Sequence, residues 1–98
     1  MAVTYISLMN FTDQGLRAIK DTTKRAEAAR KLAQEYGVTF KSLRWTQGQY
    51  DIVAELEAKD EQSYNSFAVA LMAQGFVRGQ SLRAYGADEM NAMLSRLP

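Results

Sequence analysis

The order in which strand-like and helix-like segments follow one another limits this chain to few folds. Runs rich in β-branched and aromatic residues predict four strands, over residues 3–9, 38–46, 49–57 and 76–85. Apolar residues at helical spacing predict helices over residues 12–36 (one kinked or two abutting helices), 60–74 and 88–97. The expected N-caps are Thr12 or Asp13, Asp60 and Asp88. The helix over 60–74 is expected to have one apolar face, which carries Tyr64, Phe67, Ala68 and Leu71. This order is that of the α+β, ferredoxin-like βαββαβ fold with an extra C-terminal helix. Right-handed crossovers then place both main helices on one face of a four-stranded antiparallel sheet and leave the other face open.

The second and third strands are expected to form a hairpin, which decides which side chains face the helices. A two-residue turn at Gln47-Gly48 pairs Arg44 with Asp51 and Trp45 with Tyr50. A three-residue loop would oppose Asp51 to Leu43 on the core face, which the hydrophobic pattern disfavours. The helix side then carries Leu43, Trp45, Tyr50, Ile52, Ala54 and Leu56, and the open side carries Arg44, Asp51, Val53 and Glu55. Tyr50 is expected to pack on Trp45 across the hairpin.

The same alternation assigns the side chains of the two other strands. The open face is expected to carry Tyr5, Ser7, Met9, Ser81, Arg83 and Tyr85, and the helix side Ile6, Leu8, Leu82 and Ala84. A sheet face that mixes bulky apolar groups with charges is not expected to stay bare in water. Because symmetric dimers are the commonest oligomers, we expect a second copy of the chain to cover it, as a homodimer or a higher homo-oligomer.

Composition excludes several classes of site. The 98 residues, which we expect to form a single domain over 1–98, include twelve basic and eleven acidic side chains. This balance argues against a dedicated polyanion binder. The chain has no cysteine and no histidine, which excludes thiol nucleophiles, imidazole catalysis and the metal or haem sites that these residues ligate. Because no carboxylate-dense loop supports a magnesium or calcium site either, we expect no metal and no cofactor.

Neither a membrane nor a nucleic acid is an expected partner. The first eleven residues lack a basic region and a long apolar stretch, and no window reaches about 18 consecutive apolar residues. We therefore expect a cytoplasmic location. An RNA-recognition motif shares the predicted topology, but residues 48–53 match its third-strand signature poorly. The carboxylates of Asp51 and Glu55 would repel phosphates there, and the basic residues of the first helical segment are explained as a solvated face.

Several stretches resemble the GYD-domain family, which is named for a Gly-x-Tyr-Asp signature. The signature is present as 48-GQYD-51. The likeness extends over 11-FTDQGL-16, 24-KRAEAARKLA-33, 44-RWTQGQYDIVAELEA-58 and 75-GFVRGQSLRAY-85. The chain departs from the family pattern at Lys59, where proline is usual, and at Phe76, where a polar residue is usual. These departures concern local loop shape and not the fold.

The resemblance implies an architecture more than an activity. The family is similar to the dimeric α/β-barrel superfamily, in which two ferredoxin-like sheets pack into a barrel. Relatives elsewhere in that superfamily include small cofactor-free oxygenases, stress-response proteins and haem enzymes. Likeness of fold alone does not assign one of these activities to this chain.

Asp51 has two interpretations. In the structural one, its carboxylate pairs with Arg44 or accepts backbone N–H bonds near the turn, and so fixes the hairpin and the dimer interface. In the functional one, it is a general base or a ligand anchor in a partly apolar barrel cavity, where burial would raise its pKa. Glu55 cannot form a carboxylate dyad with it within one chain, because four strand residues span roughly 13 Å.

Two functions therefore stay open. The leading hypothesis is a small structural or ligand-binding protein of the GYD type, with a small molecule in the barrel. The alternative is a cofactor-independent enzyme, similar to an oxygenase or isomerase, acting on a small aromatic or quinone-like substrate. There Asp51 would be the base, Arg44 or Arg83 the electrostatic clamp, and Tyr5 and Tyr85 the cavity wall. The candidate ligand contacts are Tyr5, Ser7, Arg44, Asp51, Arg83 and Tyr85.

Overall fold

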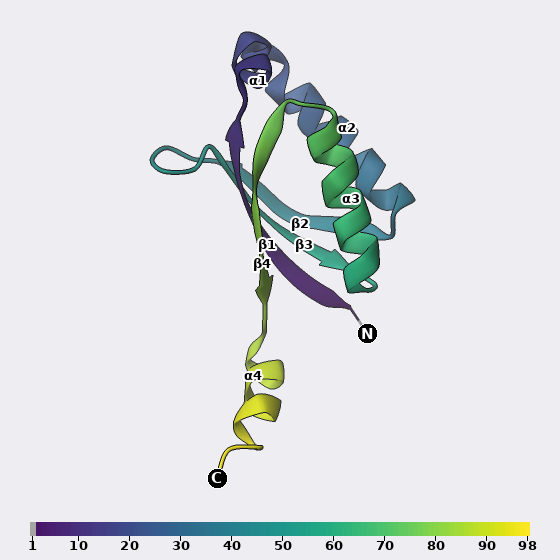
Figure 1. Ribbon diagram of the computed structural model, residues 1–98, viewed down its shortest axis with the longest axis vertical. Coiled ribbons are helices and arrows are strands. Elements are labelled where there is room, and N and C mark those ends of the chain that lie inside the picture. Colours follow the sequence, from purple (N-terminus) through teal and green to yellow (C-terminus); the bar gives the residue numbers. More distant parts are fainter. Residues whose placement is uncertain (1) are drawn as a thin grey trace.

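The computed structural model describes residues 2–98 and has the predicted α+β, ferredoxin-like arrangement (Figure 1). Its elements are β1 (Val3–Phe11), α1 (Asp13–Arg17), the 3-10 turn η1 (Ile19–Asp21), α2 (Thr22–Glu35), β2 (Val38–Trp45), β3 (Ile52–Ala58), α3 (Glu61–Ala73), β4 (Val77–Ala84) and α4 (Ala87–Leu94). The four strands form one open antiparallel sheet in the order β2-β3-β1-β4. No described helix is long and apolar enough to cross a membrane.

The helix boundaries follow the capping residues of the sequence. Thr12 caps α1 by accepting a hydrogen bond from the Gly15 N–H at 3.1 Å, and Asp60 caps α3 by accepting one from the Ser63 N–H at 2.7 Å. Glycines with positive φ follow α2 and α3, at Gly37 and Gly75. Asp88 was expected to cap the last helix, but the helix begins at Ala87 with Gly86 as its cap, so that prediction was wrong by two residues.

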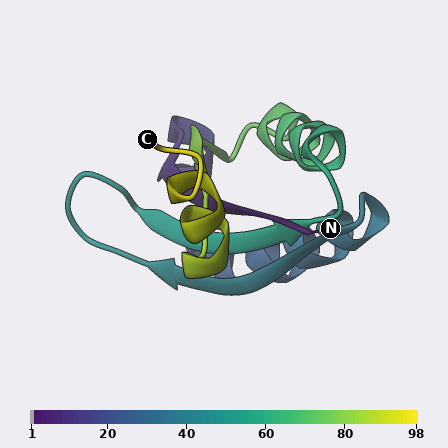
Figure 2. The ribbon, with the colours of Figure 1, turned by 90° about the horizontal axis from the view of Figure 1, so that it is seen from below.

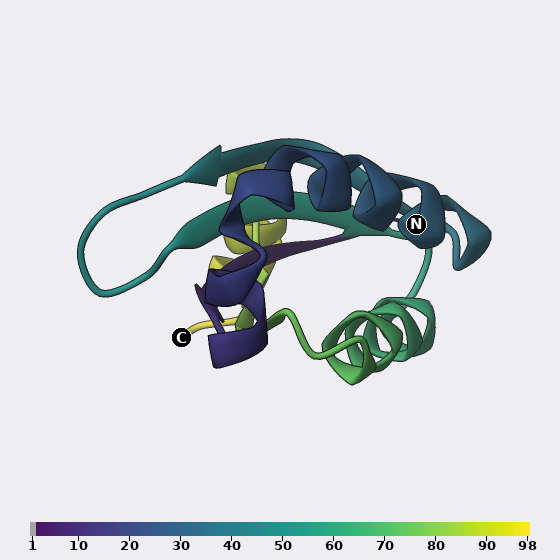
Figure 3. The same ribbon diagram turned by 90° about the horizontal axis from the view of Figure 1, so that it is seen from above.

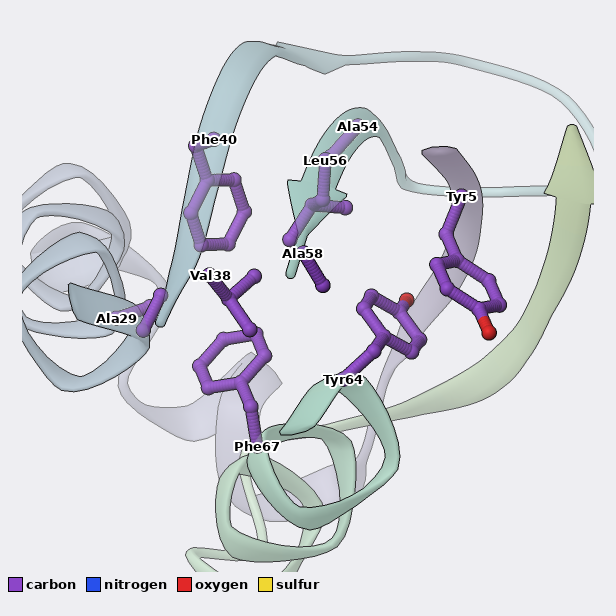
Figure 4. Packing of buried hydrophobic residues seen from close by; sticks show 10 residues of the cluster. Tyr5, Ala29, Val38, Phe40, Ala54, Leu56, Ala58, Tyr64 and Phe67 are labelled. Atoms are coloured by element: carbon purple, nitrogen blue, oxygen red, sulfur yellow. The ribbon is translucent and has the colours of Figure 1, made fainter. Parts of the chain in front are cut away.

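Helices α2 and α3 contact each other and pack on one face of the sheet, with α2 running along β2 (Figure 3). Between them and the sheet lies a core cluster (Figure 4). Phe67 of α3 is enclosed there and meets the Phe40 ring edge-on at a centroid distance of 5.9 Å. Ala29 and Ala33 form the buried side of α2. These small side chains allow α2 to lie close to the sheet.

The β2–β3 hairpin has a longer loop than predicted. Trp45 pairs with Ile52 and Arg44 with Val53, whereas a two-residue turn had predicted the partners Tyr50 and Asp51. Residues 46–51 form a loop that extends from one side of the sheet (Figure 2), and the register is interrupted near Lys41. Because the displacement is two residues, the faces stay as predicted for Leu43, Trp45, Ile52, Ala54, Leu56, Arg44, Val53 and Glu55.

The predicted faces of β1 and β4 were wrong. Tyr5, Ser7 and Met9 are only 7–8% exposed and lie on the helix side of the sheet. Ser81 and Arg83 pair with Ser7 and Tyr5 and therefore lie on that side too. Ile6, Leu8 and Leu82 lie on the open face instead. Both alternating sets of β1 are largely apolar, so periodicity did not distinguish the faces. The partner on α3 decides them, because the ring of Tyr64 stacks on that of Tyr5.

Candidate functional site

A cavity of about 340 Å³ lies between α3 and the sheet. Its wall is mostly apolar and comes from β1, β2, β3 and α3: Met9, Phe40, Leu56, Phe67, Ala68, Leu71 and Met72. Three hydroxyl-bearing residues, Ser7, Tyr64 and Ser81, also line it. Gly79, Gln80 and Ser81 of the edge strand β4 also line it and are exposed, so the cavity opens to solvent on the β4 side. A volume of this size falls in the range of small-molecule sites.

Small residues in the strands leave this space under α3. Ser7 of β1 and Ser81 of β4 are register partners on the helix face, and Gly79 is the partner of Met9. None of Ser7, Gly79 and Ser81 fills the space that a leucine or phenylalanine would take in an ordinary strand core. Tyr64 reaches down from the first turns of α3, and its phenol oxygen lies 2.5 Å from the Ser81 hydroxyl. A polar cluster of three hydroxyl groups thus stands beside apolar walls.

The Tyr64 phenol is buried and stacked. Its ring lies parallel to that of Tyr5, with centroids 3.8 Å apart and planes 8° from parallel (Figure 4). Burial raises the pKa of Tyr64 above the ordinary phenol value, although hydrogen bonds with Ser81 and Ser7 oppose that shift. Burial also raises the pKa of Tyr5. Tyr64 is therefore a neutral phenol near pH 7, able to donate a hydrogen bond to a ligand oxygen or to accept one.

Arg83 lies on the helix face next to this stack but is engaged at the start of α4. Its guanidinium carbon lies 5.9 Å from the centre of the Tyr5 ring and 4.6 Å from that of the Tyr85 ring. The guanidinium also donates to the carbonyl oxygen of Ala84 and forms an ion pair with Glu89 at 3.1 Å. These contacts give Arg83 a structural role at the junction of β4 and α4.

Residues of the signature 48-GQYD-51, which precedes β3, form hydrogen bonds with β1 and β4. The Asp51 carboxylate accepts a hydrogen bond from the Phe11 N–H at 2.9 Å, and the Asp51 N–H donates to the Met9 carbonyl oxygen at 2.9 Å. The phenol oxygen of Tyr50 accepts a hydrogen bond from the Gln80 side chain of β4, also at 2.9 Å. Gln80 pairs with Leu8 on the open face, so the expectation that Tyr50 packs on Trp45 on the helix side was wrong. Trp45 instead donates to Thr22 of α2 at 3.1 Å.

The predicted site residues do not converge within one chain. Asp51 bonds near the C-terminal end of β1, Arg83 pairs with Tyr5 nearer its N-terminal end, and Arg44 is exposed on the edge strand β2. Tyr85 follows β4 and is 50% exposed. Of the predicted ligand contacts, Ser7 lines the cavity and Tyr5 stacks on its tyrosine. Among residues 2–98, no three histidine, cysteine, aspartate or glutamate residues are grouped so as to hold a metal ion.

Tyr64 and Ser81 were not predicted as site residues. Tyr64 was placed correctly on the buried face of its helix, but it was considered only as a core residue. A usable signal was present, because a buried tyrosine hydroxyl needs a hydrogen-bonding partner. Serines in two strand segments, at positions 7 and 81, were available to supply it. Their use as a pair became visible only with the register between β1 and β4.

Comparison with known proteins identifies the family. The GYD domain family matches residues 5–94, nearly the whole chain. No curated protein matches the sequence. The structure adds that the three named positions of the signature, Gly48, Tyr50 and Asp51, lie in the loop before β3. Tyr50 bonds to β4 and Asp51 to β1. This chain belongs to the GYD-domain family.

Proposed function

We propose that this protein is a homodimeric binding protein that holds a small, largely apolar molecule between α3 and the sheet. The observation that carries the proposal is the cavity of about 340 Å³, with its apolar wall and its cluster of three hydroxyl groups. Such a combination favours a ligand with an apolar ring system and one oxygen, because apolar contact supplies affinity and a few polar groups fix orientation.

The charges near the cavity narrow the class of ligand. In the described part of the chain, Arg78 is the one charged residue among those that line it, and it is exposed on β4. The hydroxyl groups of Ser7, Tyr64 and Ser81 carry no charge near pH 7. A phenol, an alcohol or a ketone fits this interior better than a dianion or a cation, because a buried charge without a partner is costly. Tyr64 and Ser81 would exchange their mutual hydrogen bond for bonds to the ligand oxygen.

The dimeric state is proposed on the composition of the open sheet face. Ile6, Leu8 and Val53 lie together there, and Leu82 beside them is 46% exposed. Arg44 and Glu55 are exposed on the same face. A face with apolar side chains and both signs of charge is suited to a self-complementary interface. We retain the cytoplasm as the proposed location, on the sequence grounds given above.

The enzymatic alternative has less support. It required Asp51 as a free base next to an arginine clamp and a ligand. The Asp51 carboxylate accepts the Phe11 N–H instead, and Asp51 does not line the cavity. The phenol of Tyr64 is the buried titratable group among the described residues that line the cavity, and burial keeps it protonated near pH 7. It is therefore suited to binding an oxygen atom rather than to removing a proton from a substrate.

Fluorescence titration with 2-naphthol and with naphthalene tests the proposal, since the two probes differ by one hydroxyl group. Wild type is expected to bind 2-naphthol about tenfold more tightly, the value of one buried hydrogen bond. Tyr64→Phe is expected to reduce that preference to less than about threefold. Ala68→Phe fills the cavity and is expected to weaken both probes by about tenfold or more.

Ala73→Phe is the matched control, because Ala73 lies at the exposed end of the same helix. It is expected to leave both affinities unchanged. Binding that Ala68→Phe and Ala73→Phe affect equally, or no binding of either probe by wild type, would refute a ligand site under α3.

A further inference from the structure

Helix α4 stands away from the body of the protein. It continues beyond the end of β4, and no residue of it is buried (Figures 1 and 2). The molecule measures 53 × 31 × 18 Å, and its radius of gyration is 14.8 Å. A compact chain of this length has a radius of gyration of about 12.5 Å. The chain is therefore more extended than a self-contained domain.

Polar contacts, and not apolar packing, fix the direction of α4. Glu89 accepts a hydrogen bond from the Gly86 N–H at 3.3 Å and forms the ion pair with Arg83 at 3.1 Å. Arg83 also holds Tyr85 under its guanidinium. Only Tyr85 and Gly86 separate β4 from α4. This short, hydrogen-bonded connection keeps α4 from folding back onto its own sheet. Contacts within residues 83–89 therefore hold the orientation of α4.

One face of α4 is apolar and has no cover in the described chain. Met90, Met93 and Leu94 follow one another at helical spacing, and Leu97 comes shortly after the end of the helix. All four side chains are 40–65% exposed. We call α4 the arm of the molecule. Tyr85, just before it, is 50% exposed. Methionine and leucine in such a stripe are the side chains by which a helix packs on an apolar surface. The stripe needs a partner surface.

The total surface area indicates the size of that partner surface. The accessible surface of the chain is 6722 Å², whereas a compact chain of this length exposes roughly 5,600 Å². The difference is about 1,100 Å², and a standard stable protein interface buries about 800 Å² of each partner. A dimer that covers α4 and the open sheet face would thus remove the excess.

We propose that α4 of one copy packs on the open sheet face of a second copy, and that the second α4 does the same in return. The receiving surface is the apolar part of that face, formed by Ile6, Leu8, Val53 and Leu82. Two reciprocal arms give the two-fold arrangement expected of homodimers. The inference rests on the proposed homodimer and adds the element that holds it together, while the ligand cavity lies on the other side of the sheet.

Light scattering and sedimentation over a dilution series test the role of the arm with full-length variants. Met93→Glu with Leu94→Glu places two charges on the apolar stripe, and Ala92→Glu with Ser95→Glu places two on the opposite side of α4. Wild type is expected to be a dimer. The first variant is expected to raise the dimer dissociation constant by at least about 100-fold, as loss of two buried anchors should. The second is expected to stay within about threefold of wild type, since exposed substitutions contribute little.

Cross-linking identifies the surface that the arm contacts. Because the sequence has no cysteine, only the introduced thiols can react with the cross-linker. Leu94→Cys protein is mixed with Leu8→Cys protein and treated with a short bismaleimide. A cross-link between the two variants is expected, and Ala92→Cys with Leu8→Cys is expected to give none. Cross-links between Leu94→Cys copies alone would overturn the inference in favour of contact between the two arms.

Two further outcomes separate this inference from the proposed function. A wild-type monomer would overturn both the dimer and the arm. A dimer that Val53→Glu dissociates but that the Met93→Glu, Leu94→Glu variant leaves intact would keep the dimer and overturn the arm. The 2-naphthol titration reports on the ligand site independently of either result, because the cavity residues are on the opposite face from the arm's receiving surface.

Discussion

At the scale of single residues, Asp51 shows how a side chain can replace a missing strand partner. The ladder between β1 and β3 ends at the pair Met9 and Ile52. The N–H of Phe11 lies beyond it and donates to the Asp51 carboxylate. A charged acceptor makes this a stronger bond than a carbonyl would. The aspartate of the signature thus supports the end of β1. The sequence had predicted an acceptor of backbone N–H bonds, but one that fixes the hairpin and a dimer interface.

Asp51→Ala is expected to lower the free energy of unfolding by about 1–3 kcal/mol, because it leaves a half-buried N–H without an acceptor. Asp51→Asn keeps an oxygen acceptor and is expected to cost less. Urea denaturation measures both. Glu27→Ala, which removes an exposed ion pair with Arg30, serves as control and is expected to cost less than about 1 kcal/mol. An Asp51→Ala variant as stable as this control would contradict the structural role.

Tyr64 gives stability a dependence on alkaline pH. Burial raises its pKa in the folded state, while the phenol of an unfolded chain titrates at about pH 10. The folded state then holds the proton more tightly, so its contribution is fully present below about pH 10 and is lost as the pH rises through the folded pKa. Unfolding free energies measured from pH 8 to pH 11.5 are expected to fall less steeply in Tyr64→Phe than in wild type. Parallel curves for the two proteins would contradict a buried phenol.

Some single-residue positions followed from the sequence and others did not. The buried position of Tyr64 followed from helical spacing, and acceptance of backbone N–H bonds was foreseen for Asp51. The side of the sheet on which Tyr5 lies was not predicted correctly, because Tyr5 and Met9 are as apolar as Ile6 and Leu8. Which set faces the core depends on the stacking partner on α3, and that contact joins residues 59 positions apart in the chain.

At the scale of elements, the close approach of β4 to β1 depends on Gly79. A Cβ at this position would overlap the carbonyl oxygen of Leu8 and lie 2.8 Å from the Met9 Cα. β4 forms one edge of the sheet, and its contact with β1 also positions Ser81 opposite Ser7. Gly79 is therefore required both for strand pairing and for the hydroxyl cluster of the cavity.

Gly79→Ala is expected to lower the free energy of unfolding by about 1–3 kcal/mol, as overpacking does in a tight interface. Gly86→Ala is the control, because a Cβ there meets nothing within 4 Å and its φ of −78° suits alanine. Thermal melts of the two variants make the comparison. Equal melting temperatures for both variants would show that β4 can move away from β1 without cost.

Element order and helix starts were predictable because local signals encode them. The βαββαβ order, a cap at Thr12 or Asp13 and the cap at Asp60 all follow from short stretches of sequence. The hairpin register did not, because Gly48 has a φ of 120° within a six-residue loop and not in a two-residue turn. That loop closes through the Thr46 N–H to Asp51 carbonyl bond at 2.8 Å. No local sequence pattern distinguishes the six-residue loop that this bond closes from a two-residue turn.

At the scale of the whole molecule, the two faces of the sheet differ in what covers them. The helix face encloses the core and the cavity under α3. The open face and the α4 stripe carry the apolar surface that a second copy is proposed to cover. The sequence predicted a ligand inside a barrel formed by two open faces. The cavity that the structure describes lies on the opposite side of the sheet, within one chain.

Amide chemical-shift mapping during titration with 2-naphthol tests the central claim, a ligand site under α3, most directly. The largest shifts are expected at residues lining the cavity, led by Ser7, Tyr64, Ala68 and Ser81. Shifts confined to Arg44, Val53 and Glu55 on the open face would contradict it and would favour a site inside a dimeric barrel. A spectrum unchanged at saturating probe would contradict a binding function for either face.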